Sequence, residues 1–282
     1  MNTLKPIFVR EVARIDDPQF VSGQAAGHRA RRLIDAPDAA FADPFVLMAE
    51  DWTSQGAFAF HPHRGIETVT YVIEGAIEHR DNAGYEGVIR AGGVQWMTAG
   101  RGIQHEETPP AGTMAHTLQL WVNLPAAEKM AVPRYQNLEP SALPVRNEDG
   151  VEVRVFSGAY GDMVSTTLNH HPVTMLEVRV ENDGAFRHSL SATDNAFVYV
   201  LEGAVEIGST GGLLEAGQLG WLTRSEEPGS SELTITARGT AGRFLLFAGQ
   251  PLREPIAFGG PFVMNTQAEI QQAFADYRAG RF

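Results

Sequence analysis

Two pairs of residues that commonly bind metals are each separated by one residue in this sequence. His61 and His63 form the first pair, and His105 and Glu107 form the second. Successive residues of an extended strand face opposite sides, so the two members of each pair share a face. Three neutral imidazoles and one carboxylate suit a borderline divalent first-row metal, and they do not suit calcium or magnesium. If the two pairs face each other, they form a metal site that leaves iron room for water or substrate.

The segments around these pairs have the composition of short β-strands. The alternation over Ala57–His63 predicts a strand that carries both histidines on one face, and Pro62 stiffens that strand near its end. The following ETVTYVIEG is strongly β-forming and ends in a tight turn at Gly75. The chain has 282 residues with 29 Gly and 16 Pro, which indicates many turns. We therefore expect an all-β fold with the metal inside the mouth of a barrel.

Composition excludes several classes of function. The formal net charge of -12 opposes binding to phosphate backbones, and we interpret the cluster Arg29, Arg31 and Arg32 as a solvated strand face. The absence of cysteine excludes disulfides, thiolate zinc sites and cysteine nucleophiles. The N-terminus lacks the apolar core of a signal peptide, and no apolar run is long enough to span a bilayer. We expect a cytoplasmic protein that binds neither nucleic acid directly nor membranes.

The second half of the chain repeats the first without its histidines. YVIEGAIE at Tyr71–Glu78 is restated as YVLEGAVE at Tyr199–Glu206, and AGGVQWM is echoed by AGQLGWL. The repeat places Ser189, Ser191, Ser230 and Glu232 at the positions of His61, His63, His105 and Glu107. His188 lies one residue from an aligned position, so we expect it to face the other way. The sequence thus predicts one metal per chain, bound in the N-terminal half.

Other residues near the two pairs have structural interpretations. His79 and His116 lie outside the ligand pattern. His116 shares the parity of Leu118 and Leu120, so it either lines the pocket as a hydrogen-bond donor or packs in the core, and we favour packing. Arg64 and Arg101 flank the ligand pairs and could orient a substrate or Glu107, although loop arginines are more often exposed. The segment 266–280 begins with a capping box, carries an apolar stripe at helical spacing and ends at a glycine. It therefore predicts a helix packed on a barrel wall.

Longer motifs show a resemblance to a known family. HPHRGIETVTYVIEG and WMTAGRGIQHEE resemble the metal-binding motifs of cupins and, more specifically, of pirins. ADPFVLMAEDW and the closing PLREPIAFGGPFVMNTQAEIQQAFADYRAGRF extend the resemblance over nearly the whole chain. It implies two tandem cupin (jelly-roll β-barrel) domains and a short C-terminal helix. We place a metal-binding domain at 1–135 and a domain without the metal ligands at 136–282, because a proline-rich segment lies near this boundary.

The resemblance also implies a site and an activity. Glu67 is one residue earlier than the usual cupin carboxylate, and in pirins the carboxylate ligand comes from the second motif, which maps to Glu107. The implied ligands of Fe(II) are then His61, His63, His105 and Glu107, with nickel, copper, cobalt, manganese and zinc as alternative metals. For some pirins the implied activity is oxygen-dependent cleavage of a small aromatic flavonol such as quercetin, for which we expect Glu107 to be the general base. The alternative is a non-catalytic, redox-responsive iron protein that binds a transcription regulator or another protein partner.

Overall fold

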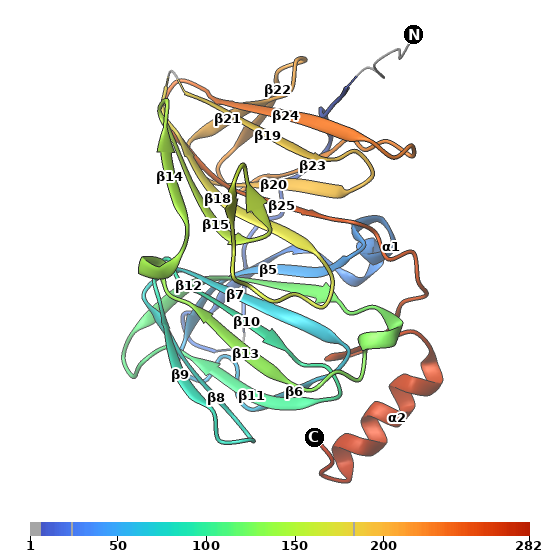
Figure 1. Cartoon of the computed structure of the whole chain (residues 1–282). Coiled ribbons are helices and arrows are strands. Elements are labelled where there is room, and N and C mark those ends of the chain that lie inside the picture. Colours follow the sequence, from blue (N-terminus) through green and yellow to red (C-terminus); the bar gives the residue numbers. More distant parts are fainter. Residues whose placement is uncertain (1–6, 24, 183) are drawn as a thin grey trace. The chain divides into compact units, whose positions relative to one another are not determined.

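The structure is a computed structural model that describes residues 7–23, 25–182 and 184–282, and most of its regular elements are β-strands (Figure 1). The chain forms two compact units, and each unit combines segments that are distant in the sequence. The first unit consists of Gln19–Ala142 and Leu252–Phe282. The second unit consists of the described residues up to Pro18 together with Leu143–Pro251. Among the described residues, no helix has the length and apolar character needed to cross a membrane.

The first unit is built from a seven-stranded sheet in the order β13-β10-β7-β12-β5-β4-β3 and a four-stranded sheet in the order β6-β11-β8-β9. Its strands are β3 (Val21–Ser22), β4 (Arg29–Ile34), β5 (Phe45–Ser54), β6 (His61–His63), β7 (Ile66–Glu74), β8 (Ala76–Asp81), β9 (Glu86–Arg90), β10 (Val94–Thr98), β11 (Ile103–Thr108), β12 (Met114–Asn123), β13 (Arg134–Leu138), β26 (Ala257–Gly259) and β27 (Phe262–Met264). Its helices are α1 (Ala39–Ala42), α2 (Gln267–Arg278) and the 3-10 turns Ala36–Asp38, Ala126–Glu128 and Pro140–Ala142.

The second unit has the same plan, with a seven-stranded sheet in the order β14-β15-β18-β25-β20-β23-β2 and a five-stranded sheet in the order β1-β24-β21-β22, in which β19 also pairs with β24. Its strands are β1 (Phe8–Val9), β2 (Val12–Asp16), β14 (Val145–Glu148), β15 (Val151–Ser157), β16 (Ala159–Tyr160), β17 (Met163–Val164), β18 (Val173–Val180), β19 (Ala185–Ser191), β20 (Asn195–Glu202), β21 (Ala204–Ile207), β22 (Gly212–Glu215), β23 (Leu219–Leu222), β24 (Ser230–Ala237) and β25 (Gly242–Gly249).

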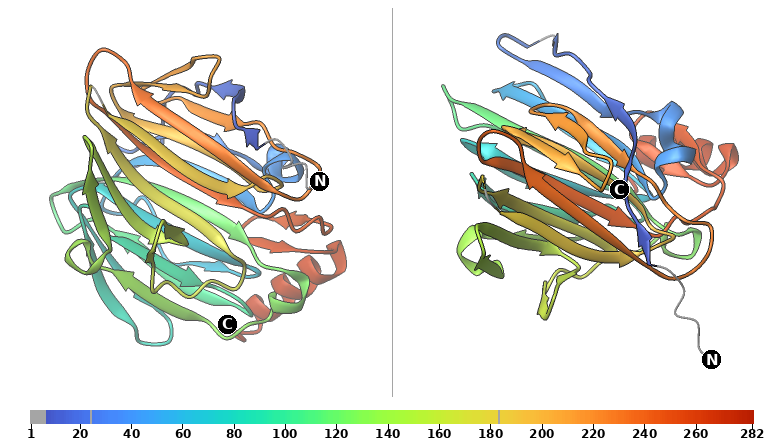
Figure 2. Two further views of the ribbon diagram at one scale, coloured as in Figure 1. Left: turned by 45° about the horizontal axis from the view of Figure 1, so that its top comes forward. Right: turned by 90° about the horizontal axis from the view of Figure 1, so that it is seen from above.

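The division of the chain differs from the contiguous domains 1–135 and 136–282 expected from the sequence. Strand β1 pairs in parallel with β24, and β2 pairs antiparallel with β23, so the first strands complete both sheets of the second unit. Figure 2 shows these blue strands beside the orange and yellow strands. The C-terminal segment Leu252–Phe282 belongs instead to the first unit. Edge pairing joins strands that are far apart in the sequence, which a boundary based on local composition does not detect.

The interiors of the two units differ in chemical character. The second unit has one large apolar cluster, which includes Phe186, Leu190 and Leu233. The first unit buries apolar residues such as Trp96 and Met97, but it encloses polar side chains as well. These buried polar residues include Glu50, Asp51, Thr53, His63, Glu67, Thr70, His79, His105, Glu107 and Thr117. Because buried polar groups are costly without partners, this concentration marks the first unit as the location of a functional site.

Several local predictions are confirmed. The repeated octapeptides occupy the hairpins β7–β8 and β20–β21. Helix α2 begins after Thr266, whose side chain and that of Glu269 form the expected capping box. Ile270 and Ala273 are buried against β26 and β27, so the predicted stripe is the packed face of the helix. The ligand strand itself begins at His61 and not at Ala57, because the preceding residues form a loop.

Candidate metal centre

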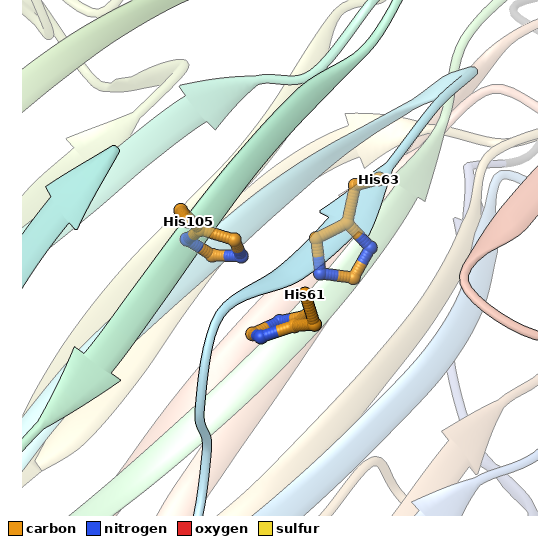
Figure 3. A group of neighbouring side chains, drawn as sticks. All are labelled: His61, His63 and His105. Carbon is orange, nitrogen blue, oxygen red and sulfur yellow. The ribbon is translucent and has the colours of Figure 1, made fainter. Parts of the chain in front are cut away.

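Antiparallel pairing of β6 with β11 brings three of the four predicted ligands together, namely His61, His63 and His105, and leaves Glu107 outside this group. The register places His61 directly opposite His105, and His63 lies on the same side two residues along. Figure 3 shows the three imidazoles of His61, His63 and His105 turned toward one another. One ligand nitrogen of each ring lies within 4.8 Å of those of the other two. Among the described residues, this is the group of side chains that could hold a metal ion.

Each of the three imidazoles has one ring nitrogen near a fixed partner, which leaves the other nitrogen available. Nδ1 of His61 lies 2.8 Å from the Ala59 oxygen, and Nδ1 of His63 lies 3.3 Å from the Pro261 oxygen. Nδ1 of His105 lies 2.9 Å from Nε2 of His79. The Nε2 atoms of His63 and His105 are buried and have no hydrogen-bond partner among the described residues. A carbonyl oxygen can only accept, so Nδ1 of His61 and of His63 carries the proton and Nε2 carries the lone pair. Histidines that bind a metal through Nε2 are oriented in this way, with Nδ1–H donating to a fixed acceptor. The lone pairs of these imidazoles are therefore available to a divalent cation.

Burial keeps His63 and His105 neutral. It lowers the pKa of His63 to about 3, with a further contribution from His61. Burial also holds the pKa of His105 well below its usual value, with smaller contributions from His63, His61 and His79. Neutral imidazoles have free lone pairs, so His63 and His105 need not lose a proton to bind a cation near pH 7.

Glu107 lies on the same face of β11 as His105, as the spacing predicts, and it is 5% exposed. Its two carboxylate oxygens accept hydrogen bonds from the Thr70 hydroxyl and the Gln119 amide, both at 2.7 Å. The carboxylate is therefore held in place by these two partners, and it does not belong to the group of three histidines. The sequence analysis did not identify Gln119, although the alternation of β12 places it on the same face as Trp121, which faces the histidines.

His79 contacts a predicted ligand, which the spacing of the sequence did not indicate. It lies on β8 opposite Glu107, is 1% exposed and contacts His105 through the 2.9 Å bond between ring nitrogens. The ring of Tyr135 covers it at a centroid distance of 4.8 Å. Its position in β8 has the parity of the buried Ile77, which is the signal that it faces inward. Only the pairing of β8 with β11 reveals that this inward position touches a ligand.

The other flanking residues divide between exposed and buried. Arg101 is exposed, whereas Arg64 is only 4% exposed and forms an ion pair with Asp276. His116 is partly buried, as expected for packing: it stacks on Trp52 at 4.2 Å and its Nε2 lies 2.5 Å from a Glu50 oxygen. None of these three residues belongs to the histidine group.

A cavity of about 760 Å³ adjoins the histidines within the first unit. His61 and His63 lie in its wall, together with the aromatic residues Phe58, Trp121 and Phe258. Polar residues, namely His28, Arg31, Arg32, Asp51 and Gln119, occupy other parts of the wall. The interpretation of the arginine cluster as a solvated face is wrong for Arg31, whose side chain pairs with the buried Glu50 at 2.6 Å. The strand pairing of β4 with β5 turns this arginine toward the carboxylate.

The second unit contains no comparable cluster within the residues described. Ser189, Ser191 and Ser230 are exposed, and the inward positions of β19 are those of Phe186, His188 and Leu190. The expectation that His188 faces away is therefore wrong, because the alignment by repeat was shifted by one residue on this strand. Burial lowers the pKa of this single imidazole to about 4.

Comparisons with known proteins agree with this architecture. Residues 29–122 match the family model described as Pirin, and residues 175–282 match the Pirin C-terminal cupin domain. A pirin-like protein of Caulobacter vibrioides is 39% identical over 97% of this chain and 99% of its own length. The chain belongs to the pirin family. A pirin-like protein of Solanum lycopersicum is 40% identical over 90% of this chain and 87% of its own length.

The pirin fold also relates the chain to a structure of stated activity. A quercetin 2,3-dioxygenase from Acinetobacter baumannii superposes with a TM-score of 0.87 and 32% identity, over 97% of this chain and 98% of that one. The chain is thus a pirin built from two cupin domains. Its histidine cluster lies in the domain that the first pirin motif covers.

Proposed function

We propose that this pirin is a metal-dependent dioxygenase that opens the ring of a flavonol such as quercetin, with Fe(II) held by His61, His63, His105 and Glu107. The observation that carries the proposal is the cavity of about 760 Å³ whose wall includes two of the histidines. A cavity of this size, with mainly apolar walls and a few polar groups, is typical of a site for a small molecule. The dioxygenase activity stated for the Acinetobacter relative supports the same class of reaction.

The chain's own residues suit a flat aromatic substrate. Phe58 and Trp121 line the cavity, and the rings of Trp121 and His63 pack in a T-shaped arrangement with centroids 5.0 Å apart. A substrate bound against Trp121 would lie beside His61 and His63, which share the cavity wall with it. Bound Fe(II) would supply a Lewis acid for a substrate hydroxyl and redox chemistry toward oxygen. The apolar walls would exclude bulk water from the reacting ring.

Glu107 is the general base in this proposal. Its carboxylate lies two residues from His105 on the same strand face, and Thr70 and Gln119 fix its orientation. It would accept the proton of the substrate hydroxyl that binds beside the histidines. Gln119 lines the cavity and donates to Glu107 at 2.7 Å, so the carboxylate is in contact with a residue of the cavity wall.

The test compares two variants of the iron-loaded protein. Glu107→Gln replaces the basic carboxylate with a neutral amide of the same shape. We therefore expect most of the metal to be retained and most turnover to be lost. His105→Ala should lose both. Metal content is measured by elemental analysis, with one equivalent expected for the wild type, and turnover by oxygen uptake together with loss of flavonol absorbance.

A negative result would separate the two functional hypotheses. If the iron-loaded wild type consumes no flavonol or related enediol faster than free iron does, the dioxygenase proposal is refuted. Pull-down from a lysate with ferrous, ferric and metal-free protein would then test the adaptor hypothesis. Partners that bind all three forms equally would contradict that hypothesis as well.

A further inference from the structure

The C-terminal segment Leu252–Phe282 lies directly against the strand that carries the first histidine pair. Phe262 forms a parallel bridge with Arg64, and the Val263 amide donates to the Arg64 oxygen at 3.1 Å. The Pro261 oxygen lies 3.3 Å from Nδ1 of His63. Phe258, Gly260 and Pro261 also line the cavity beside the histidines. The segment therefore contributes both a hydrogen-bond acceptor for a ligand ring and part of the cavity wall.

Arg64, the residue that follows His63, is held on several sides. Its Nη1 donates to Asp276 Oδ2 in helix α2 at 2.7 Å, and its Nε donates to the Arg101 oxygen at 2.6 Å. The guanidinium carbon lies 4.4 Å from the centroid of the Phe282 ring. Because Arg64 is 4% exposed, loss of the Asp276 charge alone would leave a buried cation without its counter-ion.

Lys129 makes a second connection to the same loop. Lys129 is 2% exposed, and its Nζ donates to the Gly65 oxygen at 2.9 Å, to Asn123 Oδ1 at 2.5 Å and to the Val263 oxygen at 2.8 Å. These three acceptors use all three donors of the ammonium group. Lys129 thereby links the loop after the histidine pair to the C-terminal segment.

The strand with the second ligand pair has its own connection. Asn82 Nδ2 donates to the Phe282 oxygen at 2.8 Å, and Asn82 Oδ1 accepts from the Gln104 amide at 3.1 Å. Gln104 directly precedes His105. The same segment is thus connected to both strands that bring the histidines together.

From these contacts we infer that Leu252–Phe282 is required for metal binding, because it fixes the placement of the histidines. Arg64, Lys129 and Asn82 are positioning residues that hold this segment against the ligand strands. The inference rests on the proposed function only in requiring that the histidines bind a metal. Correct placement of His63 and His105 then depends on residues supplied by the far end of the chain. Groups that orient metal ligands affect metal affinity although they do not touch the metal.

The experiment measures cobalt(II) affinity of the full-length protein at pH 7.5, from its visible absorption in competition with a chelator. Asp276→Asn removes the charge that faces Arg64, and we expect affinity to fall about tenfold or more. Thr266→Ala is the matched control, because it removes the N-cap of the same helix without touching Arg64 or the ligand strands. It should lower the thermal midpoint while leaving cobalt affinity unchanged.

Asn82→Ala provides a second test that leaves no buried charge behind, since this side chain is exposed. We expect it to weaken cobalt binding several-fold while the protein remains folded. Affinities within twofold of the wild type for both Asp276→Asn and Asn82→Ala would overturn the inference, as would equal weakening by Thr266→Ala. A wild type that binds no metal would overturn both this inference and the proposed function. A wild type that binds metal but consumes no flavonol would overturn only the function.

Discussion

Replacing His79 by leucine should weaken metal binding although His79 itself holds no metal. When His105 binds a cation through Nε2, its Nδ1 carries the proton and donates to His79 Nε2, which lies 2.9 Å away. Coordination makes that N–H a stronger donor, so the hydrogen bond matters more in the loaded protein than in the empty one. In His79→Leu the buried donor has no acceptor, which costs about 1–3 kcal/mol. This corresponds to a loss of about 5- to 140-fold in affinity.

The assay is competition with a chelator, combined with thermal unfolding of the metal-free protein. His79→Gln retains an acceptor oxygen and should recover much of the lost affinity. His116→Phe is the control for loss of a buried imidazole, because His116 contacts Glu50 and Trp52 and does not contact the three histidines. Equal affinity of His79→Leu and the wild type would refute the reasoning. So would a His79→Gln variant as weak as the leucine variant.

Two further predictions concern stability. Burial lowers the pKa of His188 from 6.5 to about 4, so between these values the unfolded chain binds a proton that the folded chain does not. The free energy of unfolding should therefore rise with pH across this window, and His188→Gln should remove up to about 3 kcal/mol of that rise. Urea unfolding at pH 4 to 7 measures this, and parallel plots of unfolding free energy against pH for the two proteins would contradict it. Gly65 and Gly84 both have positive φ, but only at Gly65 would a Cβ atom lie 2.0 Å from the Val263 oxygen, whereas nothing lies within 4 Å at Gly84. Gly84→Ala should cost about 1–2 kcal/mol and Gly65→Ala clearly more, as measured by thermal unfolding, and equal costs would show that the close contact with the C-terminal segment is unimportant.

Sequence patterns predicted those features that depend on short spacing. The parity of His61 with His63, and of His105 with Glu107, fixed which side chains share a face, and the capping box at Thr266 located helix α2. The same approach failed for His188, since a shift of one residue reverses the face of every side chain in a strand.

Contacts that depend on strand register were not predictable from spacing. His79 touches His105 only because β8 pairs with β11, and Arg31 meets Glu50 only because β4 pairs with β5. The Pro261 oxygen reaches His63 across 198 residues of sequence. No local pattern records such a contact, because its cause is the pairing of distant segments in the folded chain.

The exchange of terminal segments between the two units has a consequence for how the protein is made. Synthesis proceeds from the N-terminus, and domains generally fold as units as their residues emerge. The second unit has all its residues once Pro251 has been added, whereas the unit with the histidines still lacks Leu252–Phe282. The histidines of β6 and β11 are thus among the earlier residues to leave the ribosome, yet their domain is the last to be completed. The metal proposed for the histidines would therefore enter a finished site only after Leu252–Phe282 has been translated.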